Sequence, residues 1–377
     1  MRRLLLLVGG IVFVDTMFFV ALTPLLPGYK DEFELSKAGA GVLVAAYPVG
    51  ALLGGIPGGI ATARLGARTT AIAGLLIIAV TTFIFATADS LLVLDLSRFV
   101  QGFGSALAWT AGLAWLVSET PAAQRGQTIG TAMAAAIVGA LFGPVLGGAA
   151  AAIGEGLAFG AVGLLAVGFA VWAASTHAPP PARGQPVGAF LRALRNRRIV
   201  LGVWFVALPA LLFGTLGVLA PLRLEELGFT AVAIGVLWLC TAGLEALVNP
   251  LIGRISDRVG RFGPMRASVL ASAVVAFLLP WPGRSFLLAA LVVLAGLSFG
   301  SFWTPAMALL SDEAEARGLE YAYAFALINI AWAPGHALGA SGGGALAEIT
   351  TDAVPYLLLA GACLLTFALL WRSRSFS

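Results

Sequence analysis

The sequence predicts an all-α membrane protein in which twelve membrane-spanning helices form two six-helix bundles related by pseudo-two-fold symmetry. Of the 377 residues, 60% are hydrophobic and 11% are charged, and the mean hydropathy is +0.98. Soluble domains carry about 25% charged residues, so this composition excludes a soluble domain. The apolar residues extend along the whole chain, which predicts a multi-pass protein in the lipid bilayer rather than a globular domain with one anchor.

Twelve segments are long enough to cross a bilayer, which requires about 20 apolar residues. The first segment follows Arg2 and Arg3 and resembles a secretory signal peptide, but it is too long and carries Asp15. We therefore interpret it as a retained helix. The expected spans are 4–27, 39–62, 69–88, 96–117, 127–153, 156–175, 199–221, 231–253, 265–282, 286–310, 319–346 and 354–371.

The longest polar break, residues 177–198, contains three consecutive prolines and five arginines. It divides the chain into an N-terminal bundle, 1–176, and a C-terminal bundle, 199–377. Within the break, four apolar residues fall on one face of a helix whose other face is arginine. This pattern predicts a short amphipathic helix on the anionic inner leaflet, and a solvated linker is the alternative. The four residues are Val187, Phe190, Leu191 and Leu194.

The two halves carry related patterns at similar offsets, which indicates a duplication. Gly59-x4-Arg64-x-Gly66 recurs 194 residues later as Gly253-x4-Arg258-x-Gly260. An Arg-Gly pair followed by Gly143-x3-Gly147 recurs 192 residues later, ending in Gly335-x3-Gly339. Membrane transporters are commonly built from two such repeats around a central site.

The basic residues are distributed unevenly between the two sides of the predicted membrane topology. Of the 22 lysines and arginines, 17 fall on the side of the termini, four fall on the opposite side, and Arg98 lies within a span. The positive-inside rule therefore predicts that both termini are cytoplasmic. The net charge of +4 reflects this asymmetry, so we expect no nucleic-acid partner. The preference for arginine indicates a bacterial protein and hence the cytoplasmic (inner) membrane.

A cluster of glycines lies in the predicted fifth span, where no charge occurs between Arg125 and Glu155. Glycine and proline let neighbouring membrane helices touch and bend. The pattern resembles the antiporter motif in the fifth membrane helix of drug:proton antiporters of the major facilitator superfamily, and it matches at all six positions. The resemblance implies the major facilitator fold and export rather than uptake. The six residues are Gly130, Gly139, Gly143, Pro144, Gly147 and Gly148.

The segment after the eighth span resembles the inner-loop motif of the same superfamily, which implies a latch on the cytoplasmic side. We expect Gly253 to let two helices approach, Asp257 to pair with basic groups or a helix N-terminus, and Gly260 to make a tight turn. A simple basic turn is the alternative. The motif also includes Arg258 and Arg261. The first-half copy keeps Gly59, Arg64 and Gly66 but has Ala63 at the acidic position, so a latch is expected only in the second half.

Two charged residues of the first half are candidates for proton coupling. Asp15 lies in the middle of the first span, in a stretch that resembles the first helix of the drug antiporters. We hypothesise that it binds a proton or a cation, and a structural ion pair or hydrogen bond is the alternative. Arg98 belongs to a pattern similar to a further superfamily motif, in which the arginine is tied to proton transfer. A charge within a span costs at least about 2.5–3.5 kcal/mol, so Arg98 should have an interior partner unless it extends outward to the surface.

The second half contributes Glu245 and His336 as further candidates for proton coupling. Glu245 shares a helix face with Trp238, Thr241 and Asn249, and it is either a carboxylate of the transport cavity or a partner of the inner-loop arginines. His336 stands in line with Phe325, Asn329 and Trp332. Histidine exchanges protons near neutral pH, so His336 is either functional or a hydrogen-bonded structural residue.

Aromatic and polar residues with inward-facing helical positions predict the walls of a substrate cavity. Such walls accept lipophilic or cationic ligands through burial and cation–π contacts. The predicted cavity residues are Gln101, Ser105, Trp109, Trp238, Asn329 and Trp332. Cys240 and Cys363 lie within spans, and no catalytic cluster, phosphate loop or metal-ligand spacing is visible, so we expect no enzyme activity, no cofactor and no metal.

Together these patterns predict a proton-coupled antiporter that exports small lipophilic or drug-like molecules by alternating access and acts as a monomer. The alternative is a facilitator that exports a small polar metabolite, such as a sugar, an amino acid or a nucleoside. A third class, a membrane sensor or scaffold that transports nothing, would be indifferent to substitution of Asp15 or Arg98.

Overall fold

The structure, a computed structural model, describes residues 2–121, 124–180, 188, 192–319 and 321–372, with the side chains of 126, 321–325 and 372 left aside. Twelve long helices make up the described chain, and no strand occurs in these ranges. They are α1 (Arg2–Glu32), α2 (Lys37–Leu65), α3 (Ala67–Ala86), α4 (Leu91–Ser118), α5 (Arg125–Ile153), α6 (Glu155–Ser175), α8 (Arg197–Glu226), α9 (Ala231–Val259), α10 (Phe262–Leu278), α11 (Ser285–Glu315), α12 (Tyr321–Ile349) and α13 (Ala353–Arg372).

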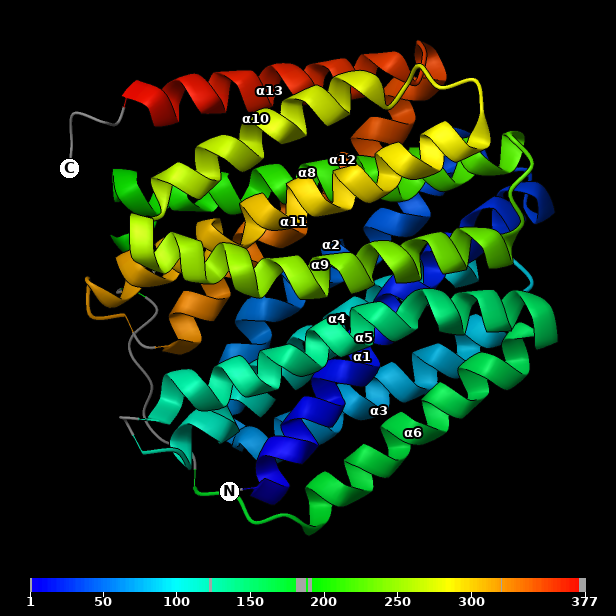
Figure 1. The fold of residues 1–377 in the computed structure, drawn as a ribbon. Coiled ribbons are helices and arrows are strands. Elements are labelled where there is room, and N and C mark those ends of the chain that lie inside the picture. Colours follow the sequence, from blue (N-terminus) through cyan, green and yellow to red (C-terminus); the bar gives the residue numbers. More distant parts are fainter. Residues whose placement is uncertain (1, 122–123, 181–187, 189–191, 320, 373–377) are drawn as a thin grey trace.

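The helices form the two expected bundles, which lie one above the other in Figure 1, with α1–α6 below and α8–α13 above. The first residues of α1, the last residues of α13 and the two helix ends that flank the break between the bundles, the end of α6 and the start of α8, lie toward the same side of the molecule, on the left in Figure 1. We call this the terminal side and the other the distal side. By length and composition, 10 of the described helices can cross a membrane, and α10 is a shorter apolar helix of 17 residues. The predicted fold class is therefore confirmed.

Most predicted spans differ from the helices only at their ends. The largest difference is in α9, which was expected to end at residue 253 but continues to Val259. The inner-loop motif is thus mostly helical, and only its final residues form the turn. The predicted amphipathic helix between the bundles falls largely in residues outside the described ranges.

The glycines of the antiporter motif pack α5 against α1. A Cβ atom built on Gly139, Gly143 or Gly147 would lie 2.5, 2.8 or 2.2 Å from a main-chain carbonyl oxygen of α1. These residues are spaced four apart, so they form one face of the helix. Only hydrogen fits between the two backbones along this face, which is how small residues create close contacts between membrane helices.

The second bundle repeats this packing between α12 and α8. A Cβ atom on Gly335 would lie 2.6 Å from the carbonyl oxygen of Ala207, and one on Gly339 would lie 2.2 Å from that of Leu211. Gly335 and Gly339 are the repeat counterparts of Gly143 and Gly147. The duplication seen in the sequence therefore preserves a specific backbone contact.

Two glycines of the repeated inner-loop motif end their helices with positive φ angles. Gly66 follows α2 with φ 89°, and Gly260 follows α9 with φ 88°. A side chain would strain the backbone at these angles. The expectation that Gly260 makes the turn is confirmed, and Gly66 does the same in the first half.

Replacing Gly147 by alanine should destabilise the protein by about 1–3 kcal/mol, because the new methyl group forces α5 away from α1. Gly130→Ala is the matched control, since nothing lies within 4 Å of a Cβ at this position of the same motif. Alanine has the higher helix propensity by about 1 kcal/mol, so the control should be neutral or slightly stabilised. Thermal unfolding of the detergent-solubilised protein measures both, and equal melting temperatures would contradict the prediction.

Candidate functional site

Asp15 forms the centre of a buried polar cluster in the first bundle. Its side chain is 4% exposed, and its Oδ2 atom accepts three hydrogen bonds, from the Tyr47 hydroxyl (2.8 Å), the Ser105 hydroxyl (2.7 Å) and the Trp109 indole N–H (2.7 Å). Its Oδ1 atom has no hydrogen-bond partner in the described chain. The site thus joins α1, α2 and α4 at one carboxyl group.

Tyr47 is the residue of this cluster that sequence reasoning missed. It is one of five tyrosines, and it stands in an otherwise apolar stretch of α2. Its hydroxyl lies 2.8 Å from both Asp15 and Ser105. Each hydroxyl carries one hydrogen, so when both hydroxyls donate to Asp15, neither has a hydrogen left for the contact between them.

Arg98 is buried close to this cluster and does not extend to the surface. Its side chain is 1% exposed, and it donates to Gln101 Oε1 (3.0 Å) and to the carbonyl oxygen of Phe19 (3.2 Å). Its guanidinium carbon lies 5.1 Å from the centre of the Tyr47 ring. The described residues contain no direct ion pair between Arg98 and Asp15.

Gln101 differs from the prediction that it lines a cavity. Its amide nitrogen donates to the Thr82 hydroxyl of α3 (3.1 Å), and its oxygen accepts from Arg98. It is 1% exposed and is therefore held within the first bundle. Ser105 and Trp109, two other predicted cavity residues, contact Asp15.

The second bundle reaches this region through aromatic residues of α12. The Phe19 ring of α1 lies 5.6 Å from Trp332 and 5.3 Å from His336, measured between ring centres. The same ring lies 4.8 Å from Tyr47. Phe19 therefore bridges the polar cluster of the first bundle and the predicted histidine of the second. His336 is buried, and its Nδ1 atom has no hydrogen-bond partner within the described residues.

Three of the predicted site residues do not belong to the Asp15 cluster. Asn329 donates to the carbonyl oxygen of Ala51 in α2 (3.3 Å). Trp238 packs against the hydrophobic core. Glu245 faces α11, and in the described chain it has no ion pair, so the expected alternative of pairing with the inner-loop arginines is not observed.

The inner-loop motif forms a charged contact within the second bundle. Arg261 lies 2.5 Å from Asp257 and 3.2 Å from Asp312 of α11. Gly253, however, has nothing within 4 Å of a built Cβ, and neither does its counterpart Gly59. The expected close helix approach at Gly253 is therefore absent in this conformation.

The two halves instead approach each other closely toward the distal side. A Cβ on Gly41 of α2 would lie 2.5 Å from the carbonyl oxygen of Ala340 in α12, and one on Gly235 of α9 would lie 2.8 Å from that of Pro144 in α5. These contacts leave no room for a side chain between the backbones. Pro144 of the antiporter motif thus faces the other half of the protein.

Polar contacts close the distal end of α2 against the second half. Lys37 Nζ lies 2.5 Å from Asp352 Oδ1, and the main-chain N–H of Ala38 donates to Glu348 Oε2 (2.9 Å). Ser36 caps the same helix by accepting from the N–H of Gly39 (3.1 Å). The carboxylate of Glu348 therefore lies at the positive end of the α2 dipole.

Toward the terminal side, α2 separates from α12. A Cβ on Gly55 would still lie 3.4 Å from the Asn329 side chain, whereas Gly59, one turn further, has no neighbour within 4 Å. The close contacts between the halves described above are thus at the distal side, and Gly59 and Gly253, toward the terminal side, have no neighbour within 4 Å of a built Cβ.

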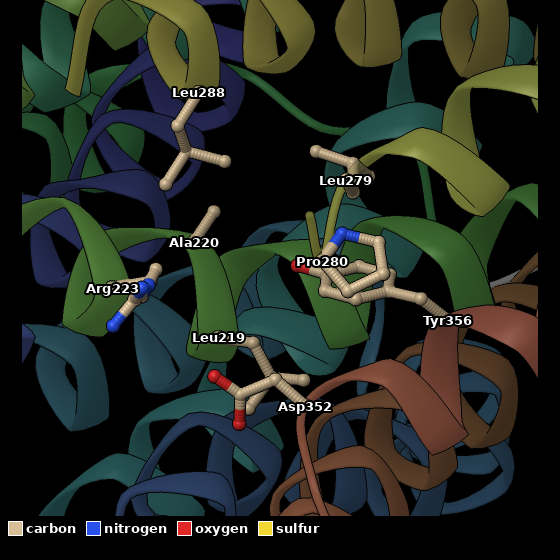
Figure 2. Close-up of a pocket in the computed structure, with 8 residues that line it drawn as sticks. All are labelled: Leu219, Ala220, Arg223, Leu279, Pro280, Leu288, Asp352 and Tyr356. Atoms are coloured by element: carbon tan, nitrogen blue, oxygen red, sulfur yellow. The ribbon is translucent and has the colours of Figure 1, made fainter. Parts of the chain in front are cut away.

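Two cavities lie near the distal ends of the helices. The recess in Figure 2 lies within the second bundle and has a volume of about 10 Å³, enough for about one water molecule. A larger cavity of about 230 Å³ is bordered by Tyr29, Glu32 and Glu155 of the first half and by Ala231 of the second. Neither is lined by the predicted substrate residues.

Comparison with known families gives a match across the chain. The sequence model described as Major Facilitator Superfamily matches residues 8–335 and 246–376. A solved structure described as a bacterial homolog to the human lysosomal transporter Spinster, inward-facing and unoccupied, has a TM-score of 0.76 at 17% identity and covers 100% of this chain and 95% of that one. The nucleoside transporter NupG gives 0.76 at 14% identity, with 98% and 99% covered. These likenesses show the fold.

Curated relatives match over part of their length. The MFS-type transporter ppzB of Metarhizium rileyi is 36% identical over 142 residues, which cover 36% of this chain and 29% of the relative. The probable vesicular acetylcholine transporter-B of Danio rerio is 32% identical over 157 residues, covering 39% and 32%. The quinolone resistance protein NorA of Staphylococcus aureus is 29% identical over 146 residues, covering 38% of each. The chain spans about a third of the length of the curated relatives it matches.

Breaking the Lys37–Asp352 pair should favour separation of the halves at the distal side. In a Cys240→Ser background, a cysteine introduced at Ala231 reports access to the larger cavity, while the native Cys363 is buried. Asp352→Asn should speed its reaction with a membrane-impermeant maleimide by a factor of about 1.5 to 5, the equivalent of about 0.2–1 kcal/mol for one partly exposed ion pair.

Glu226→Gln is the matched control for this measurement. It removes the Arg223–Glu226 pair (2.8 Å), which lies at the same side but within α8. The control should react at the unmodified rate. Equal acceleration by both substitutions would show that general loosening, and not the contact between halves, is responsible.

Proposed function

The chain belongs to the major facilitator superfamily, and we propose that it exports small lipophilic or organic cationic molecules in exchange for protons. The family and the fold identify a transporter rather than an enzyme. The substrate class and the proton coupling are the proposed part. The observation that carries the proposal is the buried Asp15 carboxyl group at the centre of the Tyr47, Ser105 and Trp109 cluster.

Asp15 is suited to bind and release the coupling proton. It is buried midway along α1, and three hydrogen-bond donors converge on its Oδ2 atom, which leaves Oδ1 as the oxygen that can carry a proton. The buried guanidinium of Arg98 lies beside the cluster, with its carbon 5.1 Å from the centre of the Tyr47 ring. Ionisable groups within membrane helices are commonly parts of such proton pathways.

The aromatic rings beside Asp15 support a lipophilic or cationic cargo. Phe19, Trp109 and Trp332 offer apolar faces next to one carboxylate, and a cation can gain both cation–π contacts and charge attraction there. The names of two partial relatives agree with this chemistry, because one transporter is named for acetylcholine, an organic cation, and another for quinolone resistance. A cation and a proton would compete for Asp15.

Alternating access follows from the two-half architecture. The distal contacts close one side while the helices diverge at the other, as expected for one end state of a rocking motion. The excess of basic residues at the terminal side supports placing that side in the cytoplasm. We accordingly propose a monomer in a bacterial inner membrane, with cytoplasmic termini and a site that faces inward in this conformation.

Proteoliposomes test this function with ethidium as the lipophilic cation. An acidic interior should drive ethidium uptake into vesicles that contain the protein, and Asp15→Asn should reduce this uptake to the level of protein-free vesicles, since the amide cannot exchange a proton. Fluorescence of ethidium bound to trapped DNA measures the uptake.

Asp95→Asn serves as the control, because Asp95 is a half-buried carboxylate of α4 that lies outside the cluster. It should behave as the unmodified protein. Transport that is unchanged in Asp15→Asn would remove Asp15 from the mechanism. Transport of labelled sugars, amino acids or nucleosides, without ethidium transport, would instead support a metabolite facilitator.

A further inference from the structure

Glu245 occupies a recess that the sequence of α11 leaves open for it. The residue stands halfway along α9, between Ala231 and Val259. A Cβ built on Gly296 would lie 2.6 Å from its Oε1 atom, and one on Gly300 would lie 2.9 Å from its Oε2 atom. Two glycines four residues apart on α11 thus make room for both carboxyl oxygens, and a larger residue at either position would displace the carboxyl.

No cation in the described chain neutralises this carboxyl group. The helices that pack against α9 are α1, α5, α8, α10 and α11, and apart from Asp15 their charged residues stand near the helix ends, as do Arg125, Arg223, Arg266, Asp312 and Glu313. No ion pair in the described chain joins any of these, or Asp15, to Glu245. On α9 itself the next charge is Arg254, nine residues away, or about 13 Å along the helix.

The neighbouring polar group on the same helix face is also incomplete. Asn249 follows Glu245 by one turn, and its Oδ1 atom is buried without a hydrogen-bond donor in the described residues. Both side chains are half-buried in an apolar helix, where a charge or polar group without a partner is costly. A hydrogen on Glu245 removes the charge and supplies a donor.

We propose that Glu245 is a second proton-binding site, separate from Asp15, so that two protons enter for each monovalent cation that leaves. The two carboxyl groups lie in different halves: three side chains of α2 and α4 donate to Asp15, whereas Glu245 lies against Gly296 and Gly300 of α11. This inference rests on the proposed function. Its consequence is a charge balance: two positive charges move in and one moves out, so the cycle carries one net charge across the membrane. With Asp15 alone the same exchange would be electrically neutral.

Ethidium accumulation under a membrane potential at equal pH distinguishes these stoichiometries. Proteoliposomes receive an inside-positive potential from an inward potassium gradient and valinomycin. This potential opposes passive entry of a cation, so accumulation under it requires the outward movement of more than one proton. For the unmodified protein, the ratio of ethidium inside to ethidium outside should rise about tenfold for each 60 mV. One charge across 100 mV corresponds to about 2.3 kcal/mol, and the cycle moves one net charge.

Glu245→Gln should abolish the accumulation driven by the potential while it preserves accumulation driven by an acidic interior. Asp95→Asn is again the control and should retain both responses. Unmodified protein that responds to the pH gradient but not to the potential would overturn the second proton site and leave the proposed function intact. Unmodified protein that responds to neither gradient would contradict the proposed function itself.

The folding of Glu245→Gln is checked by size-exclusion chromatography and thermal unfolding. A folded variant that loses both responses would contradict the independence of the two sites. If the variant does not fold, the unmodified protein still decides the question through labelling with dicyclohexylcarbodiimide, which modifies protonated carboxyls in apolar surroundings. Peptide mass spectrometry should find label on Glu245 that decreases as the pH rises. Glu245 without label, in protein labelled elsewhere, would overturn the assignment.

Discussion

The close backbone contact between the two halves at the distal side is the constraint on which the rest of the structure depends. It occurs twice, between α2 and α12 at Gly41 and Ala340, and between α9 and α5 at Gly235 and Pro144. Gly235 is 194 residues after Gly41, the offset that relates the sequence repeats, whereas Pro144 lies one helical turn before Gly148, the counterpart of Ala340. The repeat therefore produces two related contacts between the halves, and each lacks space for a side chain.

This contact between the halves also positions two residues predicted from the sequence, Pro144 and His336. The helices α5 and α12 contact the opposite half, and each also packs closely against a helix of its own half through glycines. The α5 glycines pack against α1, and the α12 glycines pack against α8. Pro144 and His336 stand at equivalent positions in the repeat, and both face the opposite half, Pro144 through its carbonyl oxygen against Gly235 and His336 through its ring against Phe19. The duplicated scaffold thus presents a backbone carbonyl at one boundary and a titratable ring at the other.

Sequence patterns predicted the fold and the buried charges because both follow from the incompatibility of polar groups with lipid. Asp15 and Arg98 are conspicuous in apolar helices, and hydropathy alone locates the helices. Tyr47 and Phe19 were missed because aromatic residues in an apolar stretch give no signal of their partners. Gln101 was assigned to a cavity from helical spacing, which cannot show that Thr82 of another helix binds it. The recess around Glu245 depends on glycines some fifty residues away in α11, and no local pattern connects them.

Two side chains, Ser36 and Glu348, accept hydrogen bonds from the N–H groups of the first turn of α2, and only one of them depends on contact between the halves. Ser36 belongs to the same chain segment as the helix it caps, whereas Glu348 comes from α12 across the boundary. When the halves part here, the Ala38 N–H exchanges Glu348 for water at a net cost of about 0.5–1.5 kcal/mol, while Ser36 keeps the helix from fraying. Separation of the halves at this point would therefore leave the first turn of α2 folded.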